Sequence, residues 1–189
     1  DVLMHKGEIR CDTIAVSGGW NPAVHLHAQS GGKPQFSDRC ASVIPGISIQ
    51  KETSAGGSNG TFGLLSCLRE GAEAGQSAAE NAGFKTELQL DIPAVKSSKE
   101  EVIRPVWVVP NGLKEGRGGK KFVDYQNDTT VADIILAVRE GYRSVEHLKR
   151  YTALGFGTDQ GKLGNINGMA ILAQITGKEP GQIGTTTFR

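Results

Sequence analysis

The sequence lacks the marks of several protein classes. It contains no run of about 20 apolar residues, which is the length that a transmembrane helix needs. Its net charge is +1, so it has no basic excess for binding nucleic acid. The first residues, DVLMHKGEIRCD, do not follow the basic-then-apolar plan of a signal peptide. We therefore expect a cytoplasmic protein whose partners include neither nucleic acid nor a membrane.

The sequence also lacks a cysteine motif for metal or redox chemistry. Its three cysteines, Cys11, Cys40 and Cys67, are an odd number and form no C-x-x-C pair. This pattern favours reduced, structural thiols over a disulfide framework or a metal cluster. His25 and His27 alternate like metal ligands, but no third ligand lies nearby in the sequence, so we expect ordinary surface or core imidazoles and no metal.

A phosphate-binding P-loop is missing as well. The stretch LGFGTDQGK, residues 154–162, has the glycines and the lysine of such a loop. However, Lys162 is followed by Leu163 instead of a serine or threonine, and the preceding segment has the pattern of a helix, whereas a P-loop follows a strand. Both chain ends look cut, because the start leads straight into a predicted strand and IGTTTFR ends without a helix or polar tail. We expect a piece of a longer protein.

The first half of the chain predicts two buried strands and two helices. The strands are the apolar runs at 8–17 (EIRCDTIAVS) and 46–50 (GISIQ), each bounded by turn residues. A proline and the cluster SGGKP predict a loop between them, with one short helix around 23–28. A longer helix is predicted over 61–83, which follows the glycine-rich stretch ETSAGGSNG.

The predicted helix over 61–83 has one face made of small and apolar residues. They recur every three or four positions: Phe62, Leu65, Leu68, Ala72, Gly75 and Ala79. Gly71 and Gly75 each disfavour an isolated helix by roughly 1 kcal/mol. We therefore expect this helix to approach another backbone or a dinucleotide closely.

The second half predicts an extended segment and then a compact helical module. Residues 85–120, which include VIRPVWVVP, are a linker or a strand laid across a neighbour. Three helices are predicted after it, at 129–141, 144–155 and 165–177, with N-caps at Thr129 or Thr130 and at Ser144, and with Gly177 closing the last.

The first half resembles the C-terminal part of a two-dinucleotide-binding flavoprotein domain. AVSGGWNP resembles the late strand and glycine turn of that fold, and ISIQKETSAGGSNGTFGLLSCLREGAEAG resembles its last strand, loop and helix. A helix N-terminus favours pyrophosphate or ribose oxygens by about 0.3 to 1 kcal/mol per charge. The usual acidic residue is replaced by Ser54, Ala55 and Gly56, which permits a dinucleotide other than a flavin, and the opening G-x-G-x-x-G is absent.

The second half resembles the alpha subunit of heterotetrameric sarcosine oxidases, through REGYRSVEHLKRYT and GTDQGK. The resemblance implies an α/β fold, the C-terminal part of an NAD-binding domain, at 1–84, a linker at 85–120 and a small mostly helical domain at 121–189. It implies oxidative demethylation of sarcosine to glycine with hydrogen peroxide and, with tetrahydrofolate, methylenetetrahydrofolate. The implied partners are the beta, gamma and delta subunits. Substrate oxidation belongs to the beta subunit in that family, so no catalytic residue is expected in this chain.

The resemblance also implies two cofactor contacts. The residues expected to bind NAD are Ser17, Gly18, Gly19, Ser54, Gly56, Gly57, Asn59, Gly60 and Thr61. The family holds an FMN between its alpha and beta subunits. As a hypothesis, the residues expected to line it are Thr158, Gln160, Lys162 and Asn165, which place donors where a loop meets a helix.

An iron–sulfur cluster is not expected. Related alpha subunits of amino-acid dehydrogenases bind a two-iron two-sulfur cluster in the small domain, and their cysteine positions fall here on Asp124, Gln126, Asp159 and Gly164. None of these supplies the thiolate that such clusters need. Asp124 and Asp159 are better interpreted as structural hydrogen-bonding groups than as a catalytic pair.

Two alternatives stay open at this point. One is the alpha subunit of a proline, opine or similar amino-acid dehydrogenase, which the missing cysteines disfavour. The other is a non-catalytic interaction module in which the glycine-rich loops are turns only.

Overall fold

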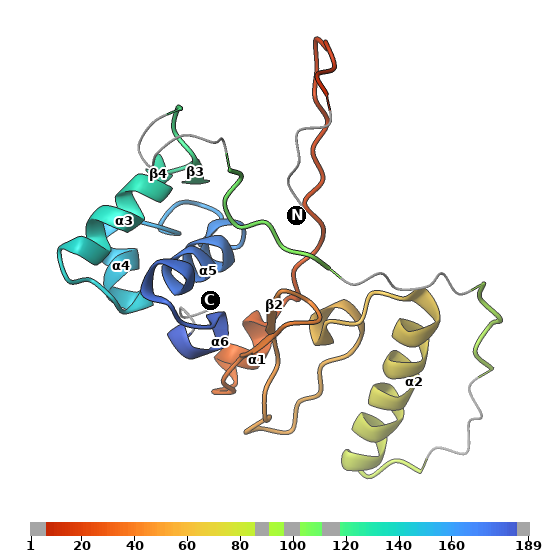
Figure 1. The fold of residues 1–189 in the computed structure, drawn as a ribbon. Coiled ribbons are helices and arrows are strands. Elements are labelled where there is room, and N and C mark those ends of the chain that lie inside the picture. Colours follow the sequence, from red (N-terminus) through yellow and green to blue (C-terminus); the bar gives the residue numbers. More distant parts are fainter. Residues whose placement is uncertain (1–6, 86–90, 97–102, 111–117, 185–189) are drawn as a thin grey trace.

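The chain folds as a small sheet with helices, followed by a mostly helical region, in agreement with the predicted fold class. The computed structural model describes residues 7–85, 91–96, 103–110 and 118–184. In Figure 1 the elements α1 and β2 lie between the helical region on one side and α2 on the other. Parts of the predicted linker at 85–120 lie outside the described residues.

The first region contains one hairpin, three helices and long loops. The helices are α1 (His25–Gln29), the 3-10 helix η1 (Gly56–Asn59) and α2 (Leu64–Asn81). Strand β1 (Gln35–Ser37) pairs antiparallel with β2 (Ser42–Ile44). The short helix predicted around residue 25 is confirmed.

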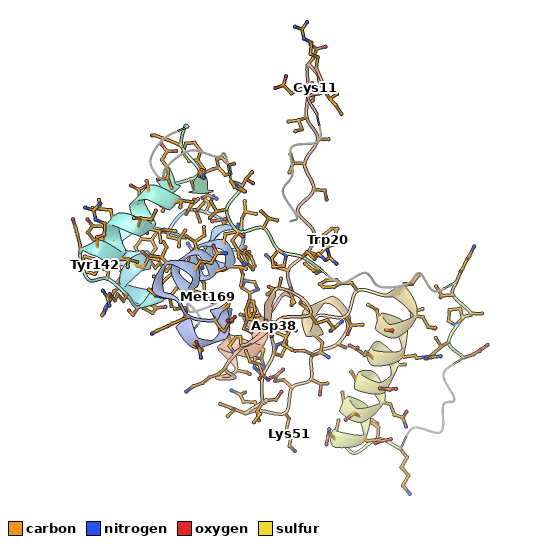
Figure 2. The ribbon with its side chains drawn as sticks, in the orientation of Figure 1. Cys11, Trp20, Asp38, Lys51, Tyr142 and Met169 are labelled. Atoms are coloured by element: carbon orange, nitrogen blue, oxygen red, sulfur yellow. The ribbon has the colours of Figure 1, made fainter. Side chains whose placement is uncertain are left out.

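The two buried strands predicted for this region are wrong. Residues 8–17 form no strand, and Ile14 and Val16 are 78% and 84% exposed. A strand needs a neighbour for its hydrogen bonds, and within the described ranges no strand pairs with this segment. Figure 2 shows Cys11 near the far end of this extended segment and Trp20 at its base. The second strand lies at β2, a few residues before the predicted 46–50, because Val43 is the residue that enters the core.

Helix α2 confirms the predicted helix but not its packing. It begins at Leu64, after the turn that contains Thr61, and none of its residues is fully buried. A Cβ atom added at Gly71 or Gly75 would meet no atom within 4 Å. Within the described residues, no other backbone therefore approaches these glycines closely. Among the described elements, α2 packs chiefly on η1 at its own beginning.

The second region is a helical module with a small hairpin, and its three predicted helices are confirmed. The sequence did not predict the hairpin or the last helix. The elements are β3 (Phe122–Asp124), β4 (Thr129–Thr130), α3 (Val131–Arg139), α4 (Val145–Thr152), α5 (Gly164–Thr176) and α6 (Pro180–Ile183). Within the part of the chain that the structure describes, no helix has both the length and the apolar character needed to cross a bilayer.

Local capping explains why the helices of this region begin and end where they do. The Thr130 hydroxyl accepts from the Asp133 N–H at 3.4 Å, and the Asp133 carboxylate accepts from the Thr130 N–H at 2.8 Å. The Ser144 hydroxyl accepts from the His147 N–H at 3.2 Å. Gly177 ends α5 with φ 67°, a left-handed conformation that glycine adopts without strain.

The two regions share one hydrophobic core around α5. Buried side chains of the helical region include Ile134, Leu148 and Leu172, and Val24 and Val43 of the first region belong to the same cluster. The described residues Trp107 and Val108 of the predicted linker pack against this cluster and are partly buried. The described stretch at 103–110 is therefore laid on a neighbour, but it forms no strand there.

Candidate functional site

Two polar clusters coincide with the predicted binding residues. The first is the glycine-rich loop at 56–61, which precedes α2. The second is the polar corner, which we define as the β3–β4 turn at 124–129 together with the loop at 153–164 between α4 and α5.

A carboxylate from α2 gathers the donors of the glycine-rich loop. Glu70 lies in the second turn of α2. Its Oε2 atom accepts from the Gly56 N–H at 2.9 Å and from the Asn59 amide at 3.5 Å. Its Oε1 atom accepts from the Thr61 hydroxyl at 2.6 Å. Three residues predicted to bind NAD are thus held by a fourth that the sequence analysis missed.

The hydrogen bonds keep Glu70 ionised. Burial raises its pKa, but the donors on Thr61, Gly56 and Asn59 outweigh burial and bring the pKa below its ordinary value. The positive charge of Arg39 lowers the pKa in the same direction, and its guanidinium also donates to the Gly60 carbonyl at 2.8 Å. The loop is therefore built around a fixed negative charge.

Close packing makes Gly60 irreplaceable in this loop. Its φ is 78°, and an added Cβ atom would lie 2.9 Å from both Cys40 Sγ and Ile44 Cγ2. The Cys40 thiol donates to the Gly60 carbonyl at 3.4 Å, and the Cys67 thiol donates to the Thr61 carbonyl at 3.1 Å. These two free cysteines are structural, as expected.

The other predicted NAD residues are less closely gathered. Ser17, Gly18 and Gly19 lie on the exposed extended segment, and a Cβ atom at either glycine would meet no atom within 4 Å. Ser54 is half-buried and Gly57 is exposed at the loop. The structure brings together the residues of 56–61, whereas it leaves the Gly18–Gly19 turn open.

At the polar corner, Asp124 is the central buried group. It is 4% exposed, and its Oδ2 atom accepts from the Gly155 N–H at 2.7 Å. Its Oδ1 atom accepts from the N–H groups of Gln126 at 2.8 Å and Asn127 at 3.4 Å. Burial raises the pKa of Asp124, but these donors outweigh burial and lower it. Such a carboxylate orders two loops by accepting from the backbone of both.

Gln126 ties the β3–β4 turn to the loop after α4. Its Oε1 atom accepts from the Thr158 hydroxyl at 3.0 Å and from the Asp159 N–H at 3.4 Å. An added Cβ atom at Gly157 would lie 2.0 Å from the same oxygen, so only glycine fits there. The Asp159 carboxylate accepts from the Gly161 N–H at 3.0 Å. Both aspartates of the corner accept hydrogen bonds from backbone N–H groups, which agrees with a structural role.

The four positions matched to cluster cysteines meet in the polar corner. Gln126 contacts Asp159, and a Cβ atom added at Gly164 would lie 3.5 Å from the Asp124 Cβ. The side chains present are two carboxylates and one amide, and the fourth position has none. They do not fit a two-iron two-sulfur cluster, which needs soft thiolate or imidazole ligands. No group of three metal-ligating side chains occurs within the described ranges.

Lys162 lines a cavity of about 320 Å³ that lies between the polar corner and the first region. The cavity is lined by Asn21, Pro22, Ala23, His25, Ser42, Val43, Gly161, Lys162 and Ile166. Burial and then the charge of Lys162 lower the pKa of His25. No carboxylate belongs to this described lining, so the wall favours an anion.

The predicted FMN residues divide between this cavity and the corner itself. Lys162 lines the cavity. The Thr158 hydroxyl donates to Gln126, and the Gln160 amide donates to the Gly157 carbonyl at 3.0 Å. Asn165 is buried beneath the loop. Of these four residues, Lys162 alone is among the described residues that line the cavity, whereas Thr158 and Gln160 are exposed at the surface of the corner.

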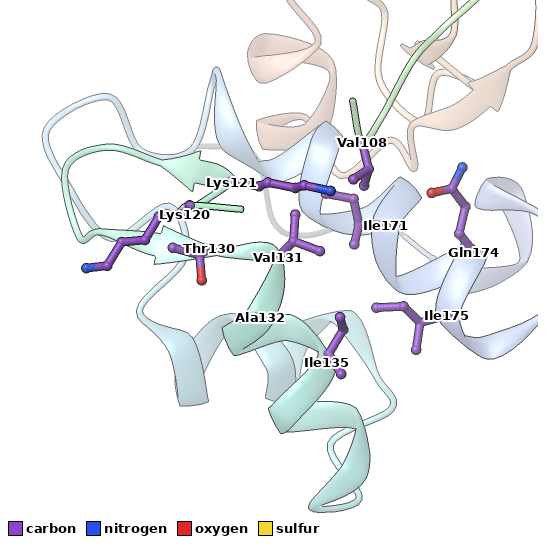
Figure 3. Close-up of a pocket in the computed structure, with 11 residues that line it drawn as sticks. Val108, Lys120, Lys121, Thr130, Val131, Ala132, Ile135, Ile171, Gln174 and Ile175 are labelled. Atoms are coloured by element: carbon purple, nitrogen blue, oxygen red, sulfur yellow. The ribbon is translucent and has the colours of Figure 1, made fainter. Parts of the chain in front are cut away.

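A larger, mostly apolar cavity of about 500 Å³ lies between α3 and α5 (Figure 3). Its walls carry the side chains of Val131, Ile135, Ile171 and Ile175, with Val108 at one edge. No pattern in the sequence predicted this cavity. Among the described residues that line it, only Lys120 and Lys121 are titratable.

His27 is a structural residue. It is 2% exposed, its Nδ1 atom lies 2.8 Å from Glu52 Oε1, and its Nε2 atom accepts from the Gly46 N–H at 3.1 Å. The hydrogen bond with His27 lowers the pKa of Glu52. Because both ring nitrogens have partners, His27 has no position left for a metal, and it is the core imidazole expected from the sequence.

Comparison with known proteins decides the family of the second region. Residues 118–189 match the family model described as the sarcosine oxidase A3 domain. The polar corner and helices α3 to α6 lie within these matched residues, which we call the A3 domain after the family that they resemble.

The similarity extends over nearly the whole chain. It is 43% identical over 185 residues to the sarcosine oxidase subunit alpha of Rhizobium meliloti (strain 1021), covering 96% of this chain and 18% of that protein. It is 40% identical to the subunit alpha of Corynebacterium sp. (strain P-1), covering 94% and 18%. The resemblance recognised in the sequence is confirmed, and the chain spans 18% of the length of these curated relatives.

A solved structure supports the fold. The chain superposes on the L-proline dehydrogenase from P. horikoshii with a TM-score of 0.64 and 20% sequence identity, covering 89% of this chain and 35% of that one. At this identity the likeness concerns the fold alone. It spans both the first region and the A3 domain.

Proposed function

We propose that the chain is the part of a sarcosine oxidase alpha subunit that joins a dinucleotide-binding domain to the A3 domain. The observation that carries the proposal is the 43% identity over 96% of the chain. The complex is an oxidoreductase of the cytoplasm that contains beta, gamma and delta subunits. It demethylates sarcosine to glycine with hydrogen peroxide, and forms methylenetetrahydrofolate from tetrahydrofolate.

In this proposal the chain contributes binding and subunit contacts to the complex, and the catalytic residues belong to other parts of it. Asp124 and Asp159 are occupied by backbone donors. The complete complex, assayed with sarcosine and with proline, should oxidise sarcosine and leave proline unchanged. Oxidation of proline instead would favour the rival amino-acid dehydrogenase function.

We propose that the glycine-rich loop at 56–61 contacts NAD. Its support is the ordered conformation of this loop directly before α2, where Glu70 holds Gly56, Asn59 and Thr61 together. Ser17, Gly18, Gly19, Ser54, Gly57 and Gly60 belong to the same proposal. In a titration of NAD against the full-length subunit, joint replacement of Asn59 by Ala and Thr61 by Val should weaken binding by about tenfold, the loss expected for one or two polar contacts.

The control for this titration is Ser66→Ala, because Ser66 is exposed on α2 and away from the loop contacts. It should leave the dissociation constant for NAD unchanged. A wild-type subunit without affinity for NAD would contradict this part of the proposal and would favour the interaction module.

We propose that Lys162 helps to retain FMN at the boundary of the A3 domain with the beta subunit, together with Thr158, Gln160 and Asn165. Its support is the cavity beside Lys162, whose described wall carries positive charge and no carboxylate. A phosphate monoester has the charge to suit such a wall. Lys162→Ala in the full complex should lower the FMN content after gel filtration, whereas Lys51→Ala, exposed in the first region, should not. Unchanged flavin content and activity in Lys162→Ala would contradict the role of Lys162.

We also propose that this A3 domain holds no iron–sulfur cluster. The donor set of Asp124, Gln126, Asp159 and Gly164 supports this, because it offers no sulfur. Chemical analysis of the purified complex should find neither iron nor acid-labile sulfide in stoichiometric amount, and finding both would contradict the proposal.

A further inference from the structure

We propose that Glu70 is a positioning residue that holds the glycine-rich loop at 56–61 in its folded conformation. The part of the inference that concerns dinucleotide affinity depends on the proposed NAD function. The part that concerns loop order stands on the geometry alone.

The Glu70 carboxylate joins the two ends of the loop. Gly56, at the start, donates its N–H to Oε2, and Thr61, at the end, donates its hydroxyl to Oε1. The backbone adds one closing bond, from the Thr61 N–H to the Gly56 carbonyl at 3.0 Å. One side chain, fixed to α2, thus links both ends of a six-residue loop to the helix that follows.

The loop needs such a link because its own structure is weak. It consists of η1, a 3-10 helix of four residues that begins at the left-handed Gly56 with φ 61°, followed by the left-handed Gly60 with φ 78° and by Thr61. Short 3-10 helices have poor hydrogen-bond geometry, and glycines lose more conformational entropy on folding than other residues. Helix α2 adds no fully buried residue at this junction. Charge-assisted hydrogen bonds, which are about twice as strong as neutral ones, are therefore a main source of order there.

A glutamine at position 70 would keep the shape of the side chain but not its function. Its amide has a single acceptor oxygen, and its NH₂ group would face a donor on either Gly56 or Thr61. The Thr61 hydroxyl can rotate and accept, but the Gly56 N–H has no such choice. With its oxygen on the Gly56 N–H and its NH₂ group donating to the Thr61 hydroxyl, the glutamine keeps both ends of the loop tied, but only by neutral hydrogen bonds, which are about half as strong as charge-assisted ones.

If the loop leaves its folded conformation more often, the apparent affinity for a dinucleotide should fall. A ligand that binds one conformation has an apparent affinity reduced by the fraction of molecules in that conformation. Glu70 would thus affect NAD binding through the geometry of Gly56, Asn59 and Thr61, without itself touching the ligand.

Hydrogen exchange measured by mass spectrometry on the full-length subunit tests the loop directly, without ligand. We expect Glu70→Gln to speed exchange in a peptide covering 56–61 by about tenfold, because its hydrogen bonds to the loop lose the strength that the charge gives them. Glu73→Gln, exposed one turn further along α2, should leave it unchanged. Glu70→Asp, which keeps the charge on a shorter side chain, should restore part of the protection. Unchanged exchange in Glu70→Gln would overturn the inference.

NAD titration of the same variants tests the second part. If the wild-type subunit binds NAD, we expect Glu70→Gln to raise the dissociation constant by about tenfold at an unchanged melting temperature, and Glu73→Gln to have no effect. Faster exchange with an unchanged dissociation constant would overturn the link between loop order and affinity. A wild-type subunit without NAD affinity would contradict the proposed NAD function, while the exchange data still decide what Glu70 does.

Discussion

At the scale of single residues, one carboxylate organises each candidate site: the half-buried Glu70 and the buried Asp124. Glu70 and Asp124 each accept three or more hydrogen bonds, mostly from loops that carry several glycines. A backbone that turns through left-handed glycines leaves N–H groups pointing inward, and a buried carboxylate satisfies several of them at once. Loop conformation in this protein therefore depends on a few charges.

The lowered pKa of Asp124 predicts how stability depends on pH. A carboxyl group with a lower pKa in the folded state stabilises the protein above its unfolded pKa of about 4, and this contribution is lost as the pH falls through the folded pKa. Asp124→Asn should lower the free energy of unfolding by about 2 kcal/mol at pH 7, because a buried donor loses its charged partner. The difference from wild type should shrink at pH 3 to 4. Urea denaturation across this range measures it.

The control for this measurement is Asp12→Asn, which removes an exposed carboxylate of the extended segment. This variant should change the free energy of unfolding little at any pH. A difference between Asp124→Asn and wild type that stays constant down to pH 3 would show that lost shape, not lost charge, causes the destabilisation.

Residue-scale prediction from the sequence succeeded where chemistry was local. Asp124 and Asp159 were expected to be structural because they stand at the positions of the related cluster loop, and both accept backbone hydrogen bonds. For His27 the missing third ligand argued against a metal, and the structure places the imidazole in the core. Glu70 was missed because its side chain accepts hydrogen bonds from residues that lie 9 to 14 positions before it in the sequence. An acidic residue two turns into a helix that follows a glycine-rich loop is a signal that could have found it.

At the scale of elements, the A3 helices were predictable and the strands were not. The starts of α3 and α4 depend on caps within three residues, so the sequence contains the needed information. A strand depends on a partner that can lie anywhere in the chain. The short pairs β1–β2 and β3–β4 have three and two residues in their shorter strands, too few for a visible alternation.

The capping box of α3 gives an element-scale prediction. Thr130→Ala removes the hydroxyl that accepts from Asp133, and should lower the free energy of unfolding by about 1 kcal/mol, the usual value for an N-cap. Thr130→Ser retains the hydroxyl and should lower the free energy of unfolding clearly less. Chemical denaturation followed by circular dichroism compares them, and equal losses in the two variants would assign the effect to the lost methyl group instead of the cap.

At the scale of the whole molecule, the two regions are joined by more than a connecting chain. Val24 and Val43 belong to the same core as the helices of the A3 domain, and Gly181 of α6 lies beside Phe36 of β1. The division at 84 and 120 stays a prediction about domain organisation. The shared core indicates that the segments around it stabilise one another.

Trp107 tests this mutual dependence. It packs on the shared core and, with Phe36 of β1 and Ala173 of α5, lines the same cavity. Trp107→Ala should lower the free energy of unfolding by about 2 to 3 kcal/mol, less than for a fully buried tryptophan. It should speed hydrogen exchange in both regions. Val109→Ala, exposed in the same segment, is the matched control. Faster exchange confined to one region would contradict a shared core.

The adjacency of Asp124 and Gly164 has a consequence for redox behaviour. The 3.5 Å between the Asp124 Cβ and a Cβ atom placed at residue 164 lies within the range found in disulfides. Two cysteines at these positions, without a metal, would therefore be poised to oxidise to each other. A carboxylate and a glycine make this corner inert to peroxide and to thiol exchange, so its shape would persist under oxidising conditions that would alter a cysteine-bearing relative.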